Sequence, residues 1–215
     1  MNSTGPQQTG STGSPPIQQT AAAPELSEEE IRSKIEEADK NPGNFAFQKD
    51  LGTALYRYAA MKQDVASLTQ AVRILDRANL LNSKDFDVLV ALGNAHFDIG
   101  FFEEDAARFQ KAREVYGRAL GIRPGDADVS TDLGITYFLQ KPPAYDKAVA
   151  ELKKVSETNP KHERSLQFLV QTFIKQNKLP DAEKTLVKLK SINPGSPAIT
   201  ELTSQISAAR SGTNK

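Results

Sequence analysis

Residues 112–124, AREVYGRALGIRP, decide the fold together with LGITY at 133–137, which follows nine residues later. Ala112, Tyr116 and Ala119 recur at helical spacing, so they share one face of a helix that Pro124 ends. Gly134 carries no side chain and lets a neighbouring helix approach closely. The stretch therefore predicts the end of one helical hairpin and the start of the next, packed against each other.

The same two helices recur on both sides of this stretch. The first-helix signature is a leucine followed by glycine, at Leu51-Gly52, Leu92-Gly93 and Leu133-Gly134, and valine replaces the glycine at Leu169-Val170. The second-helix signature has its leading alanine at Ala71, Ala112, Ala148 and Ala182. Each of the first three alanines lies 21 residues before the next first-helix leucine. Such constant spacing is expected of an internal repeat, so the hairpins should stack in one register.

These residues resemble the tetratricopeptide repeat family, in which a first helix carries Trp, Leu-Gly and Tyr positions and a second carries Ala, an aromatic, Ala and then Pro. The resemblance covers about residues 41–194 and gives four repeats, at about 41–83, 84–124, 125–160 and 161–194. No tryptophan occurs, and Gln48, Leu89, Ser130 and Leu166 take its position. The resemblance implies an all-α, right-handed α-solenoid.

The repeats differ in length. The interval between Pro160 and Pro194 is the 34 residues typical of the family, whereas 41 residues separate Ser83 from Pro124. The additional seven residues fall between the two helices of a hairpin and amount to nearly two helical turns. We therefore expect a longer second helix, running from about Phe102 to Leu120 in the second repeat.

The two ends of the chain have different compositions. Residues 1–24 contain no charged side chain and are rich in Ser, Thr, Gly, Pro, Gln and Ala, so 1–25 is predicted to be a disordered tail or linker, or a tether left after removal of an anchor. The solenoid should span 26–210. A capping box of Ser27 and Glu30 predicts a helix over 28–39. A capping helix is expected over 197–209, with a frayed tail at 211–215.

Composition and motifs argue against most other classes of function. The formal net charge is zero, and no apolar run approaches the roughly 18 residues of a membrane span, so neither nucleic-acid binding nor membrane insertion is expected. Without cysteine, thiolate chemistry is excluded, and His96 and His162 alone do not form a metal-ligand pattern. We find no phosphate loop or nucleophile motif. The sequence predicts no catalytic site, no cofactor and no metal.

The resemblance implies a non-enzymatic scaffold that binds a peptide or protein segment in a concave groove lined by the first helices. The matching positions of this sequence are Lys49, Tyr56, Arg57, Asn94, Phe97, Ile135, Phe138, Leu139, Arg164, Gln167, Gln171 and Lys175. Among them, Tyr56, Phe97, Ile135, Phe138 and Leu139 are predicted to form one exposed apolar strip. Asp128 and Asp132 stand where some relatives carry a clamp for chaperone carboxylates, and this departure disfavours that ligand.

The competing hypothesis is a structural module that assembles with copies of itself, through Phe101, Phe102 or Phe109. Residues 25–160 hold 18 basic and 23 acidic side chains, and residues 161–215 hold nine and four. This uneven charge distribution has two interpretations. Either the two parts are simply solvated, with net charges that cancel, or their charges steer a charged partner or a second copy of the chain. The absence of cysteine leaves both the cytoplasm and the bacterial periplasm open as compartments. The resemblance adds the bacterial envelope as a setting, because tethered scaffolds of the family occur there.

Overall fold

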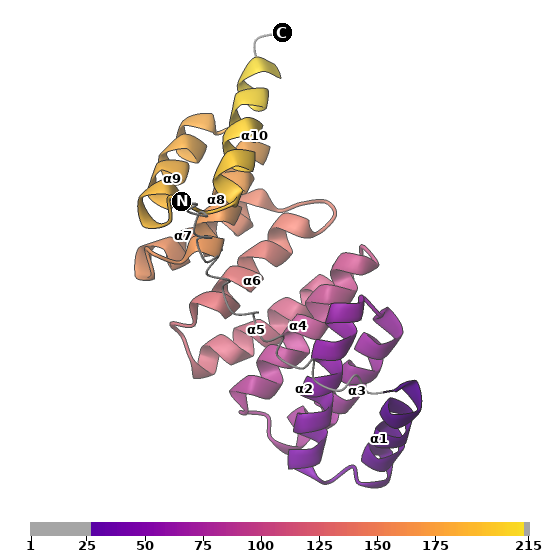
Figure 1. Ribbon diagram of the computed structural model, residues 1–215. Helices are drawn as coiled ribbons and strands as arrows, with labels where there is room; N and C mark the ends of the chain where they lie inside the picture. The colour runs from indigo at the N-terminus through magenta and orange to yellow at the C-terminus, as the bar shows by residue number, and fades with distance from the viewer. Residues whose placement is uncertain (1–26, 213–215) are drawn as a thin grey trace, which may run out of the picture.

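The computed structural model describes residues 27–212, which fold entirely into sequential packed helices (Figure 1). The helices are α1 (Glu28–Lys40), α2 (Phe45–Lys62), α3 (Val65–Leu81), α4 (Phe86–Phe102), α5 (Ala106–Ile122), α6 (Ala127–Leu139), α7 (Tyr145–Thr158), α8 (Glu163–Lys175), α9 (Leu179–Ile192) and α10 (Ala198–Gly212). The prediction for residues 1–25 lies outside the described residues.

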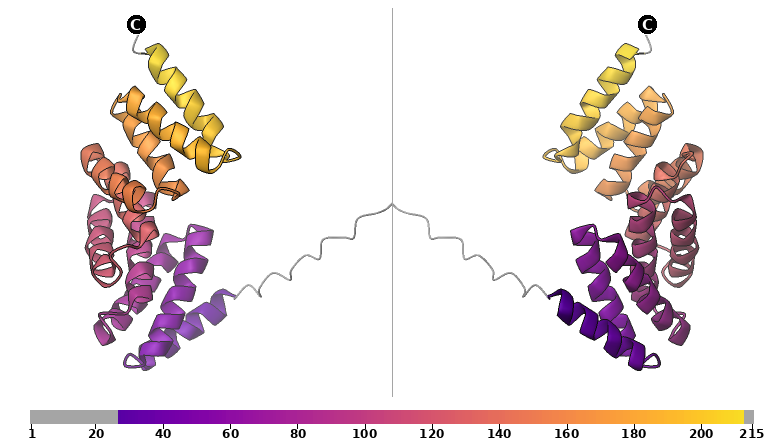
Figure 2. Two further views of the ribbon diagram at one scale, coloured as in Figure 1. Left: turned by 90° about the vertical axis from the view of Figure 1, so that its left-hand side faces the viewer. Right: turned by 90° about the vertical axis from the view of Figure 1, so that its right-hand side faces the viewer.

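Consecutive helices pair into four hairpins, α2 with α3, α4 with α5, α6 with α7 and α8 with α9. The hairpins stack because each second helix packs on the next first helix, while α1 covers α2 and α10 covers α8 and α9. Figure 2 shows the stack curving from α1 at one end to α10 at the other. The predicted all-α solenoid is confirmed.

The leucine-glycine pairs set the distance between the helices of a hairpin. A Cβ atom on Gly52 would lie 2.8 Å from Leu75, on Gly93 2.5 Å from Tyr116, and on Gly134 2.9 Å from Leu152. Each glycine therefore makes room for the large side chain at the centre of the second-helix signature. Tyr116 is 1% exposed, so the stretch that decides the fold also supplies the largest side chain of its core.

The predicted long second helix of the second repeat was wrong, because the added residues are shared between both helices of the hairpin. α4 and α5 each have 17 residues, compared with 13 and 14 in α8 and α9. Each helix thus gains about one turn at the loop end of the hairpin. Ile99 on the added turn of α4 and Phe109 on that of α5 are both buried. Lengthening only one helix would leave a turn without a packing partner.

The tight turns inside three hairpins share one geometry. Gln63, Glu104 and Asn177 have positive φ angles of 55°, 55° and 56°. In each turn the following backbone N–H reaches back across the end of the first helix, as from Asp105 to the Gly100 carbonyl at 3.0 Å. This is the left-handed closure that usually carries glycine, but no glycine marks it here. The absence of that signal explains why the end of α4 at Phe102 was not predicted.

Because Gln63 has a positive φ angle, we expect glycine to be stabilising at this position. Gln63→Gly should stabilise the protein by about 0.5–1 kcal/mol, because glycine relieves the steric cost of positive φ. The matched control, Gln110→Gly, lies inside α5 and should destabilise it by about 1 kcal/mol. Urea unfolding of the two variants checks the sign of each change. Destabilisation by both variants would contradict the assigned turn.

The two terminal helices, α1 and α10, lie close to where the sequence predicts them. The predicted capping box is present, since Ser27 and Glu30 cap each other at the start of α1. Buried Gln48 donates from Nε2 to the Ala38 carbonyl at 2.7 Å and to the Asn41 carbonyl at 3.0 Å, which ties the end of α1 to α2. At the other end, α10 continues to Gly212, beyond the predicted end at Ala209, so residues 211 and 212 are helical.

Candidate functional site

The first helices of the four hairpins form what we call the inner face of the stack. α2 contacts α4, α4 contacts α6 and α6 contacts α8. In the described part of the chain, no comparable contacts join consecutive second helices. Helices that approach one another lie on the inside of a curve, and the curvature is visible in Figure 2. The inner face is therefore the concave side of the stack.

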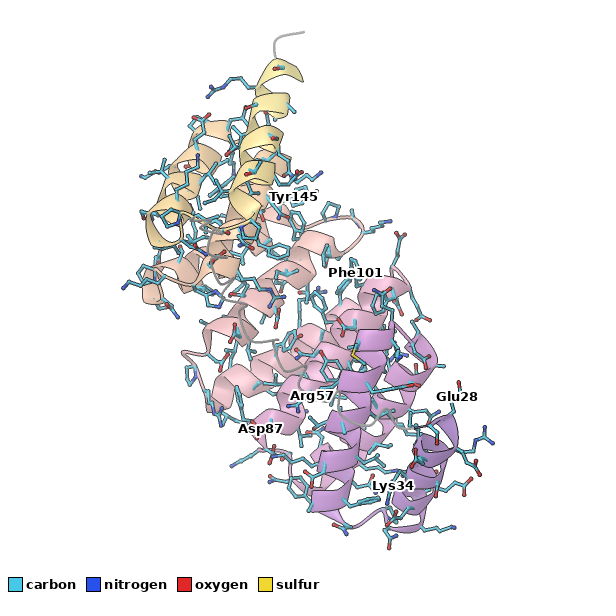
Figure 3. All side chains as sticks on the ribbon, viewed as in Figure 1. Glu28, Lys34, Arg57, Asp87, Phe101 and Tyr145 are labelled. Carbon is cyan, nitrogen blue, oxygen red and sulfur yellow. The ribbon has the colours of Figure 1, made fainter. Side chains whose placement is uncertain are left out.

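A first cavity of about 210 Å³ opens on the inner face between α2 and α4. It is lined by Thr53, Tyr56, Arg57, Phe86, Asp87, Val90, Ala91 and Asn94. Arg57 and Asp87 are exposed, and both are labelled in Figure 3. The predicted groove residue Lys49 lies 2.9 Å from Asp85 and 3.1 Å from Asp87. Its ammonium group thus links α2 to the start of α4.

A second cavity, which we call the central cavity, has a volume of about 180 Å³. It is lined by Tyr56, Asn94, Phe97, Asp98, Tyr116, Asp132 and Arg164. These residues belong to α2, α4, α5, α6 and α8, so every hairpin contributes to one site. Tyr56 and Asn94 also line the first cavity, so the two cavities adjoin.

The core holds one wall of the central cavity in place. Tyr116 is fixed against Gly93, and its hydroxyl donates a hydrogen bond to Asn94 Oδ1 at 2.7 Å. This contact orients the Asn94 amide, which also hydrogen-bonds to the Tyr56 hydroxyl. Gly93 and Asn94 are adjacent in the chain, so the packing of the hairpin and the orientation of the site depend on the same short segment.

An ion pair bridges the two carboxyl-terminal hairpins across the central cavity. Arg164 Nη1 on α8 lies 2.6 Å from Asp132 Oδ1 on α6. The Asp132 side chain is 16% exposed and that of Arg164 45%. Burial raises the pKa of Asp132, and the charge of Arg164 only partly opposes this rise. Arg164, a predicted groove residue, therefore neutralises one carboxylate of the site.

The second carboxylate of the cavity, Asp98, has no such cation. Within residues 27–212, no lysine, arginine or histidine nitrogen lies within 4.0 Å of its oxygens. Burial raises the pKa of Asp98 to about 6. The Tyr56 hydroxyl and the more distant charge of Arg164 partly oppose this rise, and the charge of Asp132 adds to it. Burial and the charge of Asp98 also raise the pKa of Tyr56. The central cavity thus carries an uncompensated negative charge above about pH 6.

The predicted apolar strip needs correction. Ile135 is 1% exposed and belongs to the core, so it is not available on the inner face. Phe97 is half-buried and packs edge-on against Phe109, with ring centroids 5.7 Å apart. Phe138 is half-buried between Tyr145 and Phe168, at 5.7 and 5.8 Å, and Leu139 is also half-buried. The inner face is therefore a mixed aromatic and polar surface rather than a continuous apolar one.

The remaining predicted groove residues lie on α8. Gln167 donates to Glu163 Oε1 at 2.8 Å and lies 3.4 Å from Ser196, so it is engaged within the fold. Gln171 is half-buried and Lys175 is exposed. Arg57 on α2 and Lys175 on α8 are thus two exposed positive charges at predicted groove positions.

The residues of the self-assembly hypothesis are mostly inaccessible. Phe109 is 2% exposed, and half-buried Phe102 packs against the core. Phe101 is 53% exposed at the loop end of α4 (Figure 3). Both Phe101 and Phe102 belong to the first helix α4, whereas the predicted second helix began at about Phe102. A single exposed phenylalanine remains from the three.

The two histidines serve the fold. His96 is 7% exposed, and burial together with the charge of Arg108 lowers its pKa to about 4, so it is neutral at pH 7. His162 caps α8 by accepting from the Ser165 backbone N–H at 3.2 Å. In residues 27–212 we find no group of three or more potential metal ligands. None of the helices described is long and apolar enough to cross a membrane.

Sequence reasoning missed the focus of the site. Asp132 was interpreted only as a departure from a known clamp, and Tyr116 only as a core residue. Asp98 was not among the predicted groove residues. The usable signal was the spacing of Asn94, Phe97 and Asp98, at i, i+3 and i+4, which places all three on one side of α4.

Comparisons with known proteins agree with this architecture. A tetratricopeptide repeat family model matches residues 144–206, which span α7 to most of α10. The comparison with curated proteins finds no match.

Solved structures share the fold. A MamA structure has a TM-score of 0.61 at 21% identity, covering 77% of this chain and 87% of that one. MamA from Desulfovibrio magneticus RS-1 has a TM-score of 0.62 at 17% identity, with 79% and 87% covered. TTC0263, a thermophilic TPR protein of Thermus thermophilus, has a TM-score of 0.58 at 16% identity, with 83% and 96% covered. At these identities the similarity concerns the fold alone.

Proposed function

We propose that this chain, a tetratricopeptide repeat protein, is a non-enzymatic scaffold that binds a peptide or protein segment along its inner face. In this proposal the repeats take residues 41–83, 84–124, 125–160 and 161–194, and the described helices of the solenoid run from Glu28 to Gly212. The observation that carries the proposal is the pair of adjoining cavities that share Tyr56 and Asn94. Pockets that combine aromatic walls with a few fixed polar groups are typical of binding sites.

The chemistry of the inner face suits a polypeptide ligand. The Asn94 amide, oriented by Tyr116, and the half-buried Gln171 amide on α8 can pair with backbone groups of a ligand. The rings of Tyr56 and Phe97 are half-buried and can pack against ligand side chains. The two cavities together are too shallow to enclose a large ligand, but they can hold successive side chains of an extended or helical segment.

The absence of cysteine from the chain allows a direct test of the inner face. Arg57→Cys on α2 and Lys175→Cys on α8 each introduce one exposed thiol on the inner face. Peptides are first selected on the parent protein from a displayed library of random peptides about a dozen residues long, enough to span several helices. A bulky maleimide dye attached at either position should then weaken binding of the selected peptides about tenfold, equivalent to about 1.4 kcal/mol.

The matched control is Lys184→Cys, which places the same dye on an exposed position of the second helix α9. Its labelling should change peptide affinity less than about twofold. Each unlabelled variant serves as its own reference. Equal effects at all three positions, or no effect on the inner face, would contradict binding there. Peptides blocked only by the dye at position 184 would instead favour binding on the second helices.

A further inference from the structure

We propose that the central cavity receives one lysine or arginine side chain of the bound segment, between Asp98 and Asp132. The inference rests on the inner face being the binding surface, and it specifies the chemistry of the partner. The cavity is lined by residues of all four hairpins, and its volume of about 180 Å³ leaves room for one long side chain. The first cavity and the exposed positions around it would take the neighbouring residues of the ligand.

The charge balance of the cavity is the main argument. Two carboxylates, Asp98 and Asp132, face one guanidinium group, that of Arg164, which already lies 2.6 Å from Asp132. The groups contributed by the other helices, Tyr56 on α2 and Tyr116 on α5, are neutral phenols at physiological pH. A carboxylate held in a partly buried site without a cation is costly, and a ligand cation would relieve that cost.

The neighbouring charges do not cancel this excess. Asp128, close to Asp132 on α6, is exposed and lies 3.0 Å from His162 Nε2. His162 acts through its other ring nitrogen as the cap of α8. Residues 25–160, which contain the cavity except for Arg164, hold 23 acidic and 18 basic side chains. The surrounding field therefore also attracts a cation.

The walls of the cavity favour a side chain over a metal ion. The aromatic rings of Tyr56 and Phe97 can cover the methylene stem of lysine or stack on an arginine, and they add a cation–π contribution. A hard divalent cation requires six or more oxygen ligands, often with several carboxylates. The central cavity offers two carboxylates, one of them paired with Arg164.

The proposal predicts that a basic peptide binds more weakly at low pH. The Asp98 carboxyl has a pKa of about 6, so it is largely neutral at pH 5 and charged at pH 7.5. A ligand cation gains its partner only in the charged form. Binding of a basic peptide should therefore be about tenfold weaker at pH 5 than at pH 7.5, with a proton released on binding between these limits.

The experiment uses the full chain and the inner-face peptides defined by the dye-blocking assay. Each lysine or arginine of a selected peptide is replaced by glutamine, and affinities are measured by calorimetry on the parent, Asp98→Asn and Asp50→Asn. One basic residue should cost about tenfold or more when replaced on the parent, but less than about threefold on Asp98→Asn. Asp50→Asn, at an exposed carboxylate of α2 that lines neither cavity, should preserve the full loss seen on the parent.

The outcomes separate this inference from the proposed function. Peptides that the inner-face dyes displace but that contain no essential basic residue would overturn the inference and leave the scaffold function standing. An essential basic residue whose loss is equally costly on Asp98→Asn would also overturn it, because its partner would lie elsewhere. Peptides that no inner-face dye displaces would refute both proposals.

Discussion

Gly93→Leu is expected to lower the free energy of unfolding by about 3 kcal/mol, the largest effect of any single substitution considered. A Cβ atom at this position would lie 2.5 Å from Tyr116 Cε1 and 2.7 Å from Cδ1, distances that force the ring to move. Tyr116 is 1% exposed and belongs to the buried core, so a displacement of its ring disturbs that packing. Its displacement would also break the 2.7 Å hydrogen bond to Asn94 and so disturb the central cavity.

Gly117→Leu on α5 is the matched control. No atom lies within 4 Å of a Cβ built on Gly117, and the residue is exposed. Leucine should therefore stabilise α5 by about 0.5–1 kcal/mol through its better helix propensity. Chemical denaturation measures both changes. A Gly93→Leu protein as stable as the parent would refute the packing of α4 against α5 described above.

The second large effect concerns Asp98 and pH. The folded protein holds the Asp98 proton up to about pH 6, whereas the unfolded chain loses it near pH 4. The folded state therefore binds more protons between these values, and the contribution of Asp98 to stability falls as pH rises from about 4 to about 6. Above about pH 6 the Asp98 carboxyl is charged in both states, so the loss of stability levels off at about 1–3 kcal/mol.

Asp98→Asn removes the titration while keeping the shape of the side chain. The variant should match the parent at about pH 4 and exceed its stability by about 1–3 kcal/mol at about pH 7.5. Asp87→Asn on the same helix, at a carboxylate whose side chain is 63% exposed, should change stability by less than about 0.5 kcal/mol at either pH. A destabilised Asp98→Asn at the higher pH would show that the carboxylate supports the fold.

Much of the fold could be predicted because it depends on short, repeated contacts. Gly52, Gly93 and Gly134 each face the large residue of the paired second helix, and this requirement appears in the sequence as a constant spacing. The end of α4 and the start of α5 could not be predicted in the same way. The turn at Glu104 adopts the left-handed conformation without glycine, so no residue type marks it.

The candidate site could be predicted only in outline. The resemblance to the repeat family indicated the inner face, but it did not distinguish Ile135, which the core covers, from Asn94, which lines both cavities. α6 contacts both α4 and α8, so side chains between these helices lose exposure. Asp98, Asp132 and Arg164 meet only through the stacking of three hairpins, and no local pattern encodes that meeting.

The pKa of the Asp98 carboxyl, measured by carbon-13 NMR in the free protein and in complex with a selected basic peptide, tests the account most directly. A cation placed beside Asp98 stabilises its charged form, so the pKa should fall from about 6 in the free protein by at least about one unit in the complex. The same peptide with its essential basic residue replaced by glutamine should not lower it. A pKa that stays the same or rises when the basic peptide binds would contradict a cation at this site.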